Sequence, residues 1–429
     1  MKFRMIKNTP VEWMDLDNAA KIFPSNSGKQ DTKVFRFSAE LYEDVDSMVL
    51  QKALDETIKE FPVFRSTLRR GLFWYYLKDS KIKPKIKKEN TPPCSSIYDA
   101  DRYNLLFDVT YFNKRINLEV YHALTDGTGA LHFLRILVYY YISIKYADEF
   151  NGKVPRPDYD ASIYQRSEDS FKKYYRGGTQ NMNFSEQRAY KIKGAKTGEY
   201  RIKVIEGVMS LKSMSDEAHK YNITLTVLLV ALFLCAINKN AELSKKSRPV
   251  VLMVPVNLRR FFRSESARNF FCTINAGYNF NEDPDDLESV AAEVSRIFKK
   301  ELTAENLAAR MNRFTKIERN AFVRLTPLWF KDIVLKIAGR NQPKGITGSV
   351  SNIGRISMPD GFEKYVRLFD VFVSTDKLQM CVCSYCDNLV VSFSSAFKDT
   401  DIQKDFFRSI VNMGIDVSVV SNKTTMEEM

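Results

Sequence analysis

A strand, a sharp turn and a buried helix follow one another directly in the first third of the chain. Residues 115–121 (RINLEVY) alternate between apolar and polar side chains, which is the period-two pattern of a half-buried strand. His122 continues the inward side of that alternation, so an imidazole is delivered to the interior at the strand end. Residues 123–129 are small, polar and glycine-bearing, which requires a turn, and residues 130–146 form an apolar run typical of a buried helix.

The turn carries the pattern H-x-x-x-D-G, formed by His122, Asp126 and Gly127. An imidazole titrates near neutrality and can both accept and return a proton, so His122 is a candidate general base. The alternative is a histidine satisfied in the core, with Asp126 as the cap of the following helix. Two further histidines, His132 inside an apolar helix and His219 near a helix end, are interpreted as structural.

Strand and helix patterns alternate in both halves of the chain, which predicts an α/β fold (α+β, mixed sheets) with helices covering each sheet. Strands are expected within residues 35–41, 64–77, 105–121, 199–208, 250–256 and 378–397, and helices within 46–61, 130–146, 210–221, 224–238, 284–298 and 401–413. A further helix carries apolar residues at helical spacing, namely Phe322, Leu325, Trp329, Ile333 and Ile337.

The two halves are separated by a charged, tyrosine-rich region between residues 151 and 193, where the periodicity is lost. We place the crossover between domains there. The predicted division is residues 1–175, which carry the histidine motif, and residues 176–429.

The formal net charge of +13 favours anionic partners: nucleic acid, anionic lipid, the phosphates of CoA, or an acidic carrier protein. No helix-turn-helix, zinc-finger or aromatic RNA-binding pattern is present, so nucleic acid is not expected. The lysine run at residues 81–88 is interpreted as a solvated hairpin or edge strand, with a phosphate-docking patch as the alternative. The first residues show no secretory signal, and the longest apolar run, residues 225–237, is too short to span a bilayer, so a cytoplasmic protein without a transmembrane segment is expected.

Three of the six cysteines, Cys381, Cys383 and Cys386, form a C-x-C-x-x-C pattern that could suggest a metal site. They lie in a segment that alternates like a strand, turns at residues 387–388 and returns, and no nearby histidine completes a tetrahedral set. We therefore interpret them as core residues in a reducing compartment and expect neither a metal nor a disulfide framework.

Several segments together resemble the CoA-dependent acyltransferase superfamily, which includes chloramphenicol acetyltransferase, condensation domains of nonribosomal peptide synthesis and bacterial alcohol acetyltransferases. They are the H-x-x-x-D-G motif, the P-V-N-L-R-R run at residues 255–260 with the following R-N-F-F at 268–271, and S-N-I-G at 351–354. The resemblance covers most of the chain and is greatest to the alcohol acetyltransferases. It implies two chloramphenicol acetyltransferase-like lobes that form a V with a central tunnel.

The resemblance also implies roles for individual residues. His122 would be the general base, and Arg259 would pair with Asp126 in a salt bridge that shapes the loop and orients the imidazole. Gly127 would keep the turn or the tunnel free of a side chain. On the substrate side it implies Tyr121, which precedes the histidine, and Ser349, Ser351 and Asn352, which are candidate hydrogen-bond donors to the developing oxyanion.

The activity implied is transfer of an acyl group, which the resemblance to the alcohol acetyltransferases makes acetyl, from a CoA thioester to an alcohol or amine. Acyl-CoA would be a co-substrate, with no permanently bound cofactor. Condensation domains carry two adjacent histidines, whereas Tyr121 precedes His122 here, and the D-F-G-W-like motif of plant members is absent. These departures favour a free-standing acyl-CoA enzyme over two alternatives, a condensation enzyme that uses an acyl carrier protein and a non-catalytic relative. No Walker loop, dinucleotide fingerprint or G-x-S-x-G elbow is present.

The segment at residues 9–24 precedes the first regular element expected from the pattern. It resembles the segment with which alcohol acetyltransferase-like proteins begin, where it covers the mouth of the site. An N-terminal arm with Trp13 as its apolar anchor is the alternative.

Overall fold

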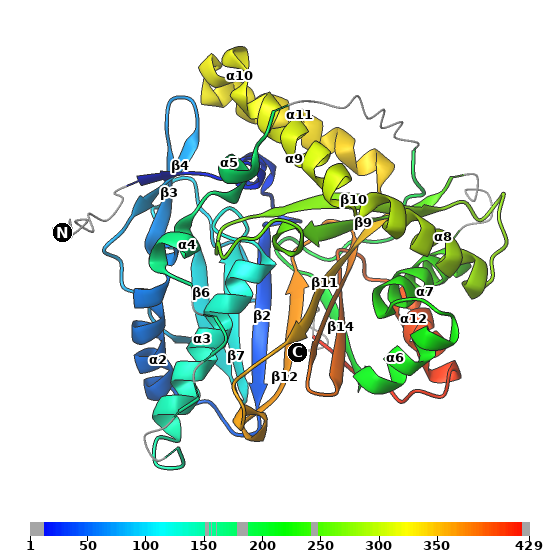
Figure 1. The fold of residues 1–429 in the computed structure, drawn as a ribbon, viewed down its shortest axis with the longest axis horizontal. Coiled ribbons are helices and arrows are strands. Elements are labelled where there is room, and N and C mark those ends of the chain that lie inside the picture. Colours follow the sequence, from blue (N-terminus) through cyan, green and yellow to red (C-terminus); the bar gives the residue numbers. More distant parts are fainter. Residues whose placement is uncertain are drawn as a thin grey trace, which may run out of the picture.

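The strands form sheets of three, five and seven members within the residues that the computed structural model describes: 13–150, 154–155, 157–159, 161–177, 188–241 and 248–422. The five-stranded and seven-stranded sheets lie side by side, each with helices packed on it (Figure 1). The mixed α/β fold predicted from the sequence is thereby confirmed.

The five-stranded sheet holds the strand that leads to His122. Its order is β12 (Val366–Val373), β2 (Val34–Leu41), β7 (Arg115–Tyr121), β6 (Phe107–Phe112) and β5 (Lys87–Lys88). The pairs are antiparallel except β5 with β6. The lysine run thus ends in an edge strand, as the sequence predicted.

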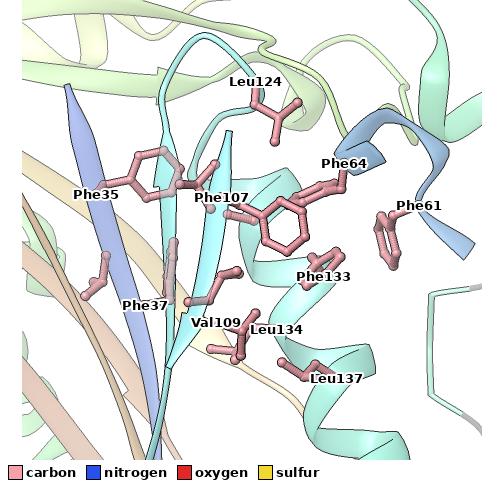
Figure 2. Close-up of a cluster of buried hydrophobic side chains, with 14 of the residues drawn as sticks. Phe35, Phe37, Phe61, Phe64, Phe107, Val109, Leu124, Phe133, Leu134 and Leu137 are labelled. Atoms are coloured by element: carbon pink, nitrogen blue, oxygen red, sulfur yellow. The ribbon is translucent and has the colours of Figure 1, made fainter. Parts of the chain in front are cut away.

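One face of this sheet is covered by α2 (Ser47–Glu60) and α3 (Gly127–Lys145), which pack against each other (Figure 1). Figure 2 shows the aromatic cluster between the sheet and α3. Phe64, which follows α2, stacks on Phe133 of α3 with ring centroids 4.2 Å apart, and Phe107 of β6 meets the same ring edge-on at 5.3 Å. This packing fixes α3, and therefore the turn before it, against the end of β7.

The seven-stranded sheet has the order β10 (Phe271–Tyr278), β9 (Val250–Asn257), β11 (Gly348–Ile356), β13 (Leu378–Tyr385), β14 (Asn388–Ser395), β8 (Lys203–Ser210) and β15 (Ser418–Ser421). The helices packed on it or on one another are α6 (Leu211–Lys220), α7 (Leu225–Lys239), α8 (Leu287–Glu301) and α12 (Asp401–Asn412). The expected hairpins at 64–77 and 378–397 are both confirmed, the first as β3 (Ser66–Arg70) with β4 (Tyr75–Asp79).

Strand β12 belongs to the C-terminal part of the sequence but pairs with β2 in the first sheet. It also contacts β13 and β14 of the second sheet. The chain therefore returns to the N-terminal half after four of the seven strands of the other sheet. No sequence pattern predicted this strand. The division into domains near residue 175 remains a prediction. Residues 366–373 belong to the second predicted domain but pair with a strand of the first.

Short elements connect the two sheets. The small sheet has the order β1 (Trp13–Asp15), β4, β3. Strand β1 is followed in the chain by the helical turns η1 (Ala19–Ile22) and α1 (Phe23–Asn26), while α4 (Ile163–Ser167) and α5 (Ser170–Tyr174) lie in the crossover region. The helix expected around Phe322 to Ile337 is two helices, α10 (Ala321–Leu325) and α11 (Leu328–Asn341), because Pro327 interrupts the backbone ladder. They follow α9 (Ala304–Arg319) along the upper edge of the molecule (Figure 1).

In the described ranges, each helix taken singly falls short of the length and apolar character needed to cross a bilayer. The pair α6–α7 meets that test only jointly, and it is bent by 82°. Cys381 and Cys383 are buried in β13, as expected of core residues, whereas Cys386 in the following turn is exposed.

Candidate active site

His122 follows the last residue of β7 and is tied down through its backbone and its ring. Its N–H donates to the carbonyl of Lys33 at 2.8 Å, and its own carbonyl accepts from Asn269 Nδ2 at 3.2 Å. The ring nitrogen Nδ1 lies 3.2 Å from Asn269 Oδ1. Asn269 comes just before β10, so a residue of the second half holds the imidazole of the first.

The contacts of Asn269 decide which nitrogen of His122 carries the proton. Its amide nitrogen faces two oxygens, the His122 carbonyl at 3.2 Å and Asp17 Oδ2 at 3.3 Å. Both of these oxygens accept hydrogen bonds, so the Asn269 nitrogen must be the group that faces them. The Asn269 oxygen then points at His122 Nδ1, and that nitrogen must donate. The neutral ring therefore keeps its lone pair on Nε2.

Asp17 supports Asn269 from behind. Its Oδ2 also accepts from the Asn269 backbone N–H at 3.2 Å, and its Oδ1 accepts from Ala20 N–H at 2.9 Å. The carboxyl group is buried, and desolvation raises its pKa to about 6, although Arg268 opposes this with Nε at 3.8 Å. Asp17, Asn269 and His122 thus form a chain of hydrogen bonds.

Three aromatic rings surround the imidazole. Phe23 of α1 stacks on it with ring centroids 4.4 Å apart and 19° between the planes, Phe35 of β2 meets it edge-on at 5.0 Å, and Phe271 of β10 lies at 5.6 Å. The desolvation they impose is the main cause that lowers the pKa of His122 below its usual value, against the opposing effects of Asp126 and Asn269. His122 as a whole residue is half-buried.

Asp126 and Arg259 lie together, with Asp126 Oδ2 2.7 Å from Arg259 Nη1 and both side chains nearly inaccessible. Asp126 also caps α3 by accepting from Gly129 N–H at 3.0 Å, and it accepts from Phe270 N–H at 2.8 Å. The cap and the ion pair were alternatives in the sequence, and the structure contains both. Arg259 fixes the loop after β9 as well, because its Nε and Nη2 donate to the carbonyl of Ser266 at 3.0 and 2.8 Å.

The turn requires glycine most strongly at Gly129. A Cβ there would overlap the carbonyl oxygen of Ala267 and the hydroxyl of Thr125, which are themselves hydrogen-bonded to each other. A Cβ at Gly127 would lie 3.1 Å from Ile353 Cδ1, the flexible end of a side chain on β11. Within this turn, the two halves therefore approach each other most closely at Gly129, two residues after Gly127, the glycine that the sequence pattern indicated.

Tyr121 lies on the other side of the strand from the imidazole. Its side chain is fully buried, its hydroxyl is 2.8 Å from Ser27 Oγ, and its ring stacks on Tyr98 with centroids 5.0 Å apart. In this arrangement Tyr121 is closed off from a substrate.

The predicted donors on β11 are engaged with neighbouring side chains. Ser349 Oγ donates to Gln379 Oε1 at 2.8 Å, and Ser351 Oγ accepts from Gln379 Nε2 at 3.2 Å. Asn352 Nδ2 donates to Thr226 Oγ1 at 2.8 Å. Of this strand, it is Ile353 that reaches the histidine turn.

The other two histidines differ from His122. His132 stacks on Tyr159 with centroids 3.7 Å apart, and its buried Nδ1 finds no hydrogen-bond partner among the residues that the structure describes. Desolvation, with help from Arg135 and Arg259, lowers its pKa to about 3, so it stays neutral. His219 is exposed on α6.

Two cavities lie outside this constellation. One of about 270 Å³ is lined by four cations, Arg188, Lys191, Arg248 and Lys344. It lies at the start of β9, whereas Arg259 follows the end of that strand. The other, of about 420 Å³, lies on the small sheet and is lined by Trp13, Asp15, Trp74, Tyr75, Tyr76 and Lys78. Within the described ranges, no three side chains of His, Cys, Asp and Glu gather as a metal site.

Comparison with known proteins gives structural neighbours. No protein-family model and no curated protein matches the sequence. The trichothecene 15-O-acetyltransferase TRI3 of Fusarium sporotrichioides is similar with a TM-score of 0.63 at 11% identity, over 95% of this chain and 96% of that one. TRI101 of F. graminearum, complexed with coenzyme A and T-2 mycotoxin, gives 0.62 at 11% identity, over 94% and 99%. A variant of the starter condensation domain of rhizomide synthetase RzmA, complexed with C8-CoA and Leu-SNAC, gives 0.60 at 12% identity, over 94% and 94%.

This chain has the fold shared by those acyltransferases and condensation domains. The resemblance drawn from the sequence is confirmed at the level of the fold. Within this acyltransferase fold, the histidine motif and the P-V-N-L-R-R run come together at the Asp126–Arg259 pair.

The sequence patterns did not assign three residues of this site: Asn269, Asp17 and Phe23. Asn269 stands in the recognised R-N-F-F segment, but its contact with a ring 147 residues earlier has no local signal. Asp17 and Phe23 belong to the N-terminal segment expected to cover the site, and the described part of that segment does contact it. Trp13, the proposed anchor of the alternative, is 59% exposed instead, and residues 9–12 lie outside the described residues.

Proposed function

We propose that this chain is an acyltransferase that moves an acyl group, in the first instance acetyl, from a CoA thioester to the hydroxyl or amine of a small acceptor. His122 is the general base. The observation that carries the proposal is the 3.2 Å contact between His122 Nδ1 and Asn269 Oδ1, because the orientation of that amide leaves the Nε2 lone pair available. The shared fold supports it.

The reaction then needs one base and no covalent enzyme intermediate. Nε2 takes the proton from the acceptor O–H or N–H as the acceptor oxygen or nitrogen attacks the thioester carbonyl carbon, and the carbonyl electrons move to its oxygen. When the tetrahedral intermediate collapses, the C=O bond reforms and the C–S bond breaks. The imidazolium returns its proton to the leaving thiolate, so CoA leaves as a free thiol and the base is regenerated.

Burial suits the imidazole to this cycle. Desolvation by the aromatic rings lowers the pKa of His122, so the base is neutral at physiological pH and needs no prior loss of a proton. Asn269 and Asp17 act as positioning residues, since they hold the ring and its tautomer without reaching the acceptor. Asp126 and Arg259 fix the turn that carries the histidine.

The oxyanion of the intermediate needs hydrogen-bond donors, for which we propose the β11 side chains Ser349, Ser351 and Asn352. Each would exchange the partner that it has here for the substrate oxygen. Gly127 would leave room beside Ile353 for the acyl group.

The test is release of CoA thiol from acetyl-CoA in the presence of a panel of alcohols and amines, with product mass to identify the acceptor. His122→Ala should lower turnover by about 10²- to 10⁴-fold, the range for losing a positioned base. His219→Ala is the matched control, because this histidine is exposed on α6, and it should keep full activity.

Three results would overturn the assignment. Full turnover by His122→Ala would remove the base. Acyl transfer from carrier-protein thioesters but not from CoA thioesters would make the chain a stand-alone condensation enzyme. Failure of both donor classes across the panel, with a folded protein, would make it a non-catalytic relative.

A further inference from the structure

The apolar stripe of α10 and α11 points outward. The exposed fractions are 85% for Phe322, 72% for Leu325, 58% for Trp329, 51% for Ile333 and 54% for Ile337. Amphipathic helices of globular proteins turn such a stripe to the core. Together with Phe330, which is 48% exposed, these six side chains form the outer face of the two helices.

The tip of the β3–β4 hairpin extends the outer face. Leu72 and Phe73 are 72% and 36% exposed, and the Leu72 carbonyl accepts from Leu328 N–H at the start of α11 at 2.9 Å. With Ile317 and Val334, the outer face and this tip contain 10 of the 22 exposed large apolar side chains of the described chain. Such concentration marks an interaction site rather than scattered surface residues.

The inner side of α11, in contrast, is held by polar contacts. Asp332 accepts from Ser25 Oγ of α1 at 2.7 Å and from Tyr75 Oη at 3.0 Å. Gly339 lies so close to Asn26 that a Cβ would overlap its side chain. The helix is therefore docked firmly, with its polar side inward and its apolar side free for an apolar partner.

The charges around the outer face are positive. Residues 304–341 contain eight lysines and arginines but three acidic residues, Glu305, Glu318 and Asp332. Two of these acids are occupied, because Glu318 pairs with Lys21 and Asp332 faces inward. Two of the eight cations are engaged as well, because Arg310 pairs with Glu301 and Lys331 is buried, which leaves the balance positive. Arg324 and Lys336 are exposed beside the apolar side chains.

We propose that the outer face and the hairpin tip bind the surface of a lipid bilayer that contains anionic lipids. Aromatic and aliphatic side chains flanked by Arg and Lys are the combination with which a helix lies in the interface of a bilayer. A second copy of the chain would bring the same cations together, on a protein of net charge +13, which disfavours self-association. The inference does not depend on the acyltransferase activity.

The test is flotation of the full chain with two kinds of vesicle, phosphatidylcholine alone and phosphatidylcholine with about 30% phosphatidylglycerol. The protein should float with the anionic vesicles and much less with the neutral ones. Replacing Trp329, Ile333 and Ile337 by Ser should lower the bound fraction about tenfold or more, because the apolar insertion is lost. Arg324→Glu with Lys336→Glu should weaken binding to the anionic vesicles alone, as should about 0.5 M salt.

The matched control replaces Val411, Val419 and Val420 by Ser, since these are 51%, 50% and 51% exposed on other elements. It should bind like the unaltered chain, and unchanged thermal unfolding of both triple variants excludes misfolding. Equal vesicle binding by the two triple variants, or no binding by the unaltered chain, overturns the proposal. The proposal is also overturned if the chain does not bind vesicles and instead uses the outer face to dimerise or to bind an acidic acyl carrier protein.

Discussion

Strand β7 has a buried ionic cluster near each end, and the two are built differently. After its end, Asp126 faces one cation, Arg259, and backbone N–H groups complete its hydrogen bonds. At its start, Arg115 faces three carboxylates, those of Glu40 at 2.8 Å, Glu206 at 2.9 Å and Asp370 at 3.1 Å. Arg367 also pairs with Glu40, at 2.6 Å, so this second cluster holds three carboxylates against two cations. Both clusters join the two sheets, but only the first is balanced in charge.

Burial therefore has opposite consequences at the two ends. Beside the first cluster, it lowers the pKa of His122, and the neutral form is the one that a general base needs. In the second, desolvation together with Asp370 raises the pKa of Glu206 to about 7. Near neutral pH, the charged form of Glu206 therefore lowers the stability of the folded protein. The balanced cluster keeps the site rigid, whereas the acidic one should make the junction of the sheets sensitive to pH.

Breaking the balanced cluster should have the largest effect. Arg259→Met leaves Asp126 buried without its cation and deprives the Ser266 carbonyl of its donors, so we expect a loss of about 3–5 kcal/mol in the free energy of unfolding. Denaturant unfolding measures it. Arg260→Met, at an exposed neighbour, is the control and should stay within about 0.5 kcal/mol. Equal values for the two variants would mean that the pair is not structural.

The next largest effect should come from the ring contact beside that cluster. Asn269→Ala removes the partner of His122 Nδ1, so the imidazole loses its fixed orientation and tautomer, and we expect kcat to fall about 10- to 100-fold with little change in KM. The control is Asn275→Ala, at an exposed asparagine of β10. ¹⁵N shifts of His122 should show the Nδ1–H tautomer in the unaltered chain, and the Nε2–H tautomer there would contradict the assignment.

The sequence predicted the strand, turn and helix around His122 because local alternation and glycine content determine them. It also predicted the Asp126–Arg259 pair, though only through the resemblance of two motifs 133 residues apart. Periodicity could not show the pairing of β12 with β2, since strand partners depend on the whole chain. Likewise, the spacing from Phe322 to Ile337 revealed an apolar stripe but not that it faces outward, because polar contacts of Asp332 turn the helix.

The acidic cluster offers a smaller effect on stability. Because the folded-state pKa of Glu206 lies above its unfolded value, the folded protein binds this proton more tightly, so the stability that Glu206 contributes should be fully present below about pH 4.5 and lost as pH rises through about 7. Glu206→Gln removes this titration, while Arg115 keeps Glu40 and Asp370. We expect the variant to lose about 2–3 kcal/mol less stability than the unaltered chain between pH 5 and 8, measured by denaturant unfolding at each pH. Asp216→Asn, at an exposed acid of α6, should leave the slope unchanged; an identical slope in Glu206→Gln would refute the charge imbalance.

The smallest effect tests burial at the other end of the strand. Since the base must be neutral, kcat/KM should fall toward acid pH with a midpoint below about 6.5, the usual value for histidine. Phe23→Ser removes the ring stacked on His122 and admits water, so the midpoint should rise by about half a pH unit or more, whereas Phe23→Leu keeps the face dry and should shift it less. The difference between these two variants isolates desolvation from the loss of a contact. A midpoint above 7 in the unaltered chain would show that the Asp126 charge, rather than the aromatic rings, governs the imidazole, and the contrast between the two ends of β7 would disappear.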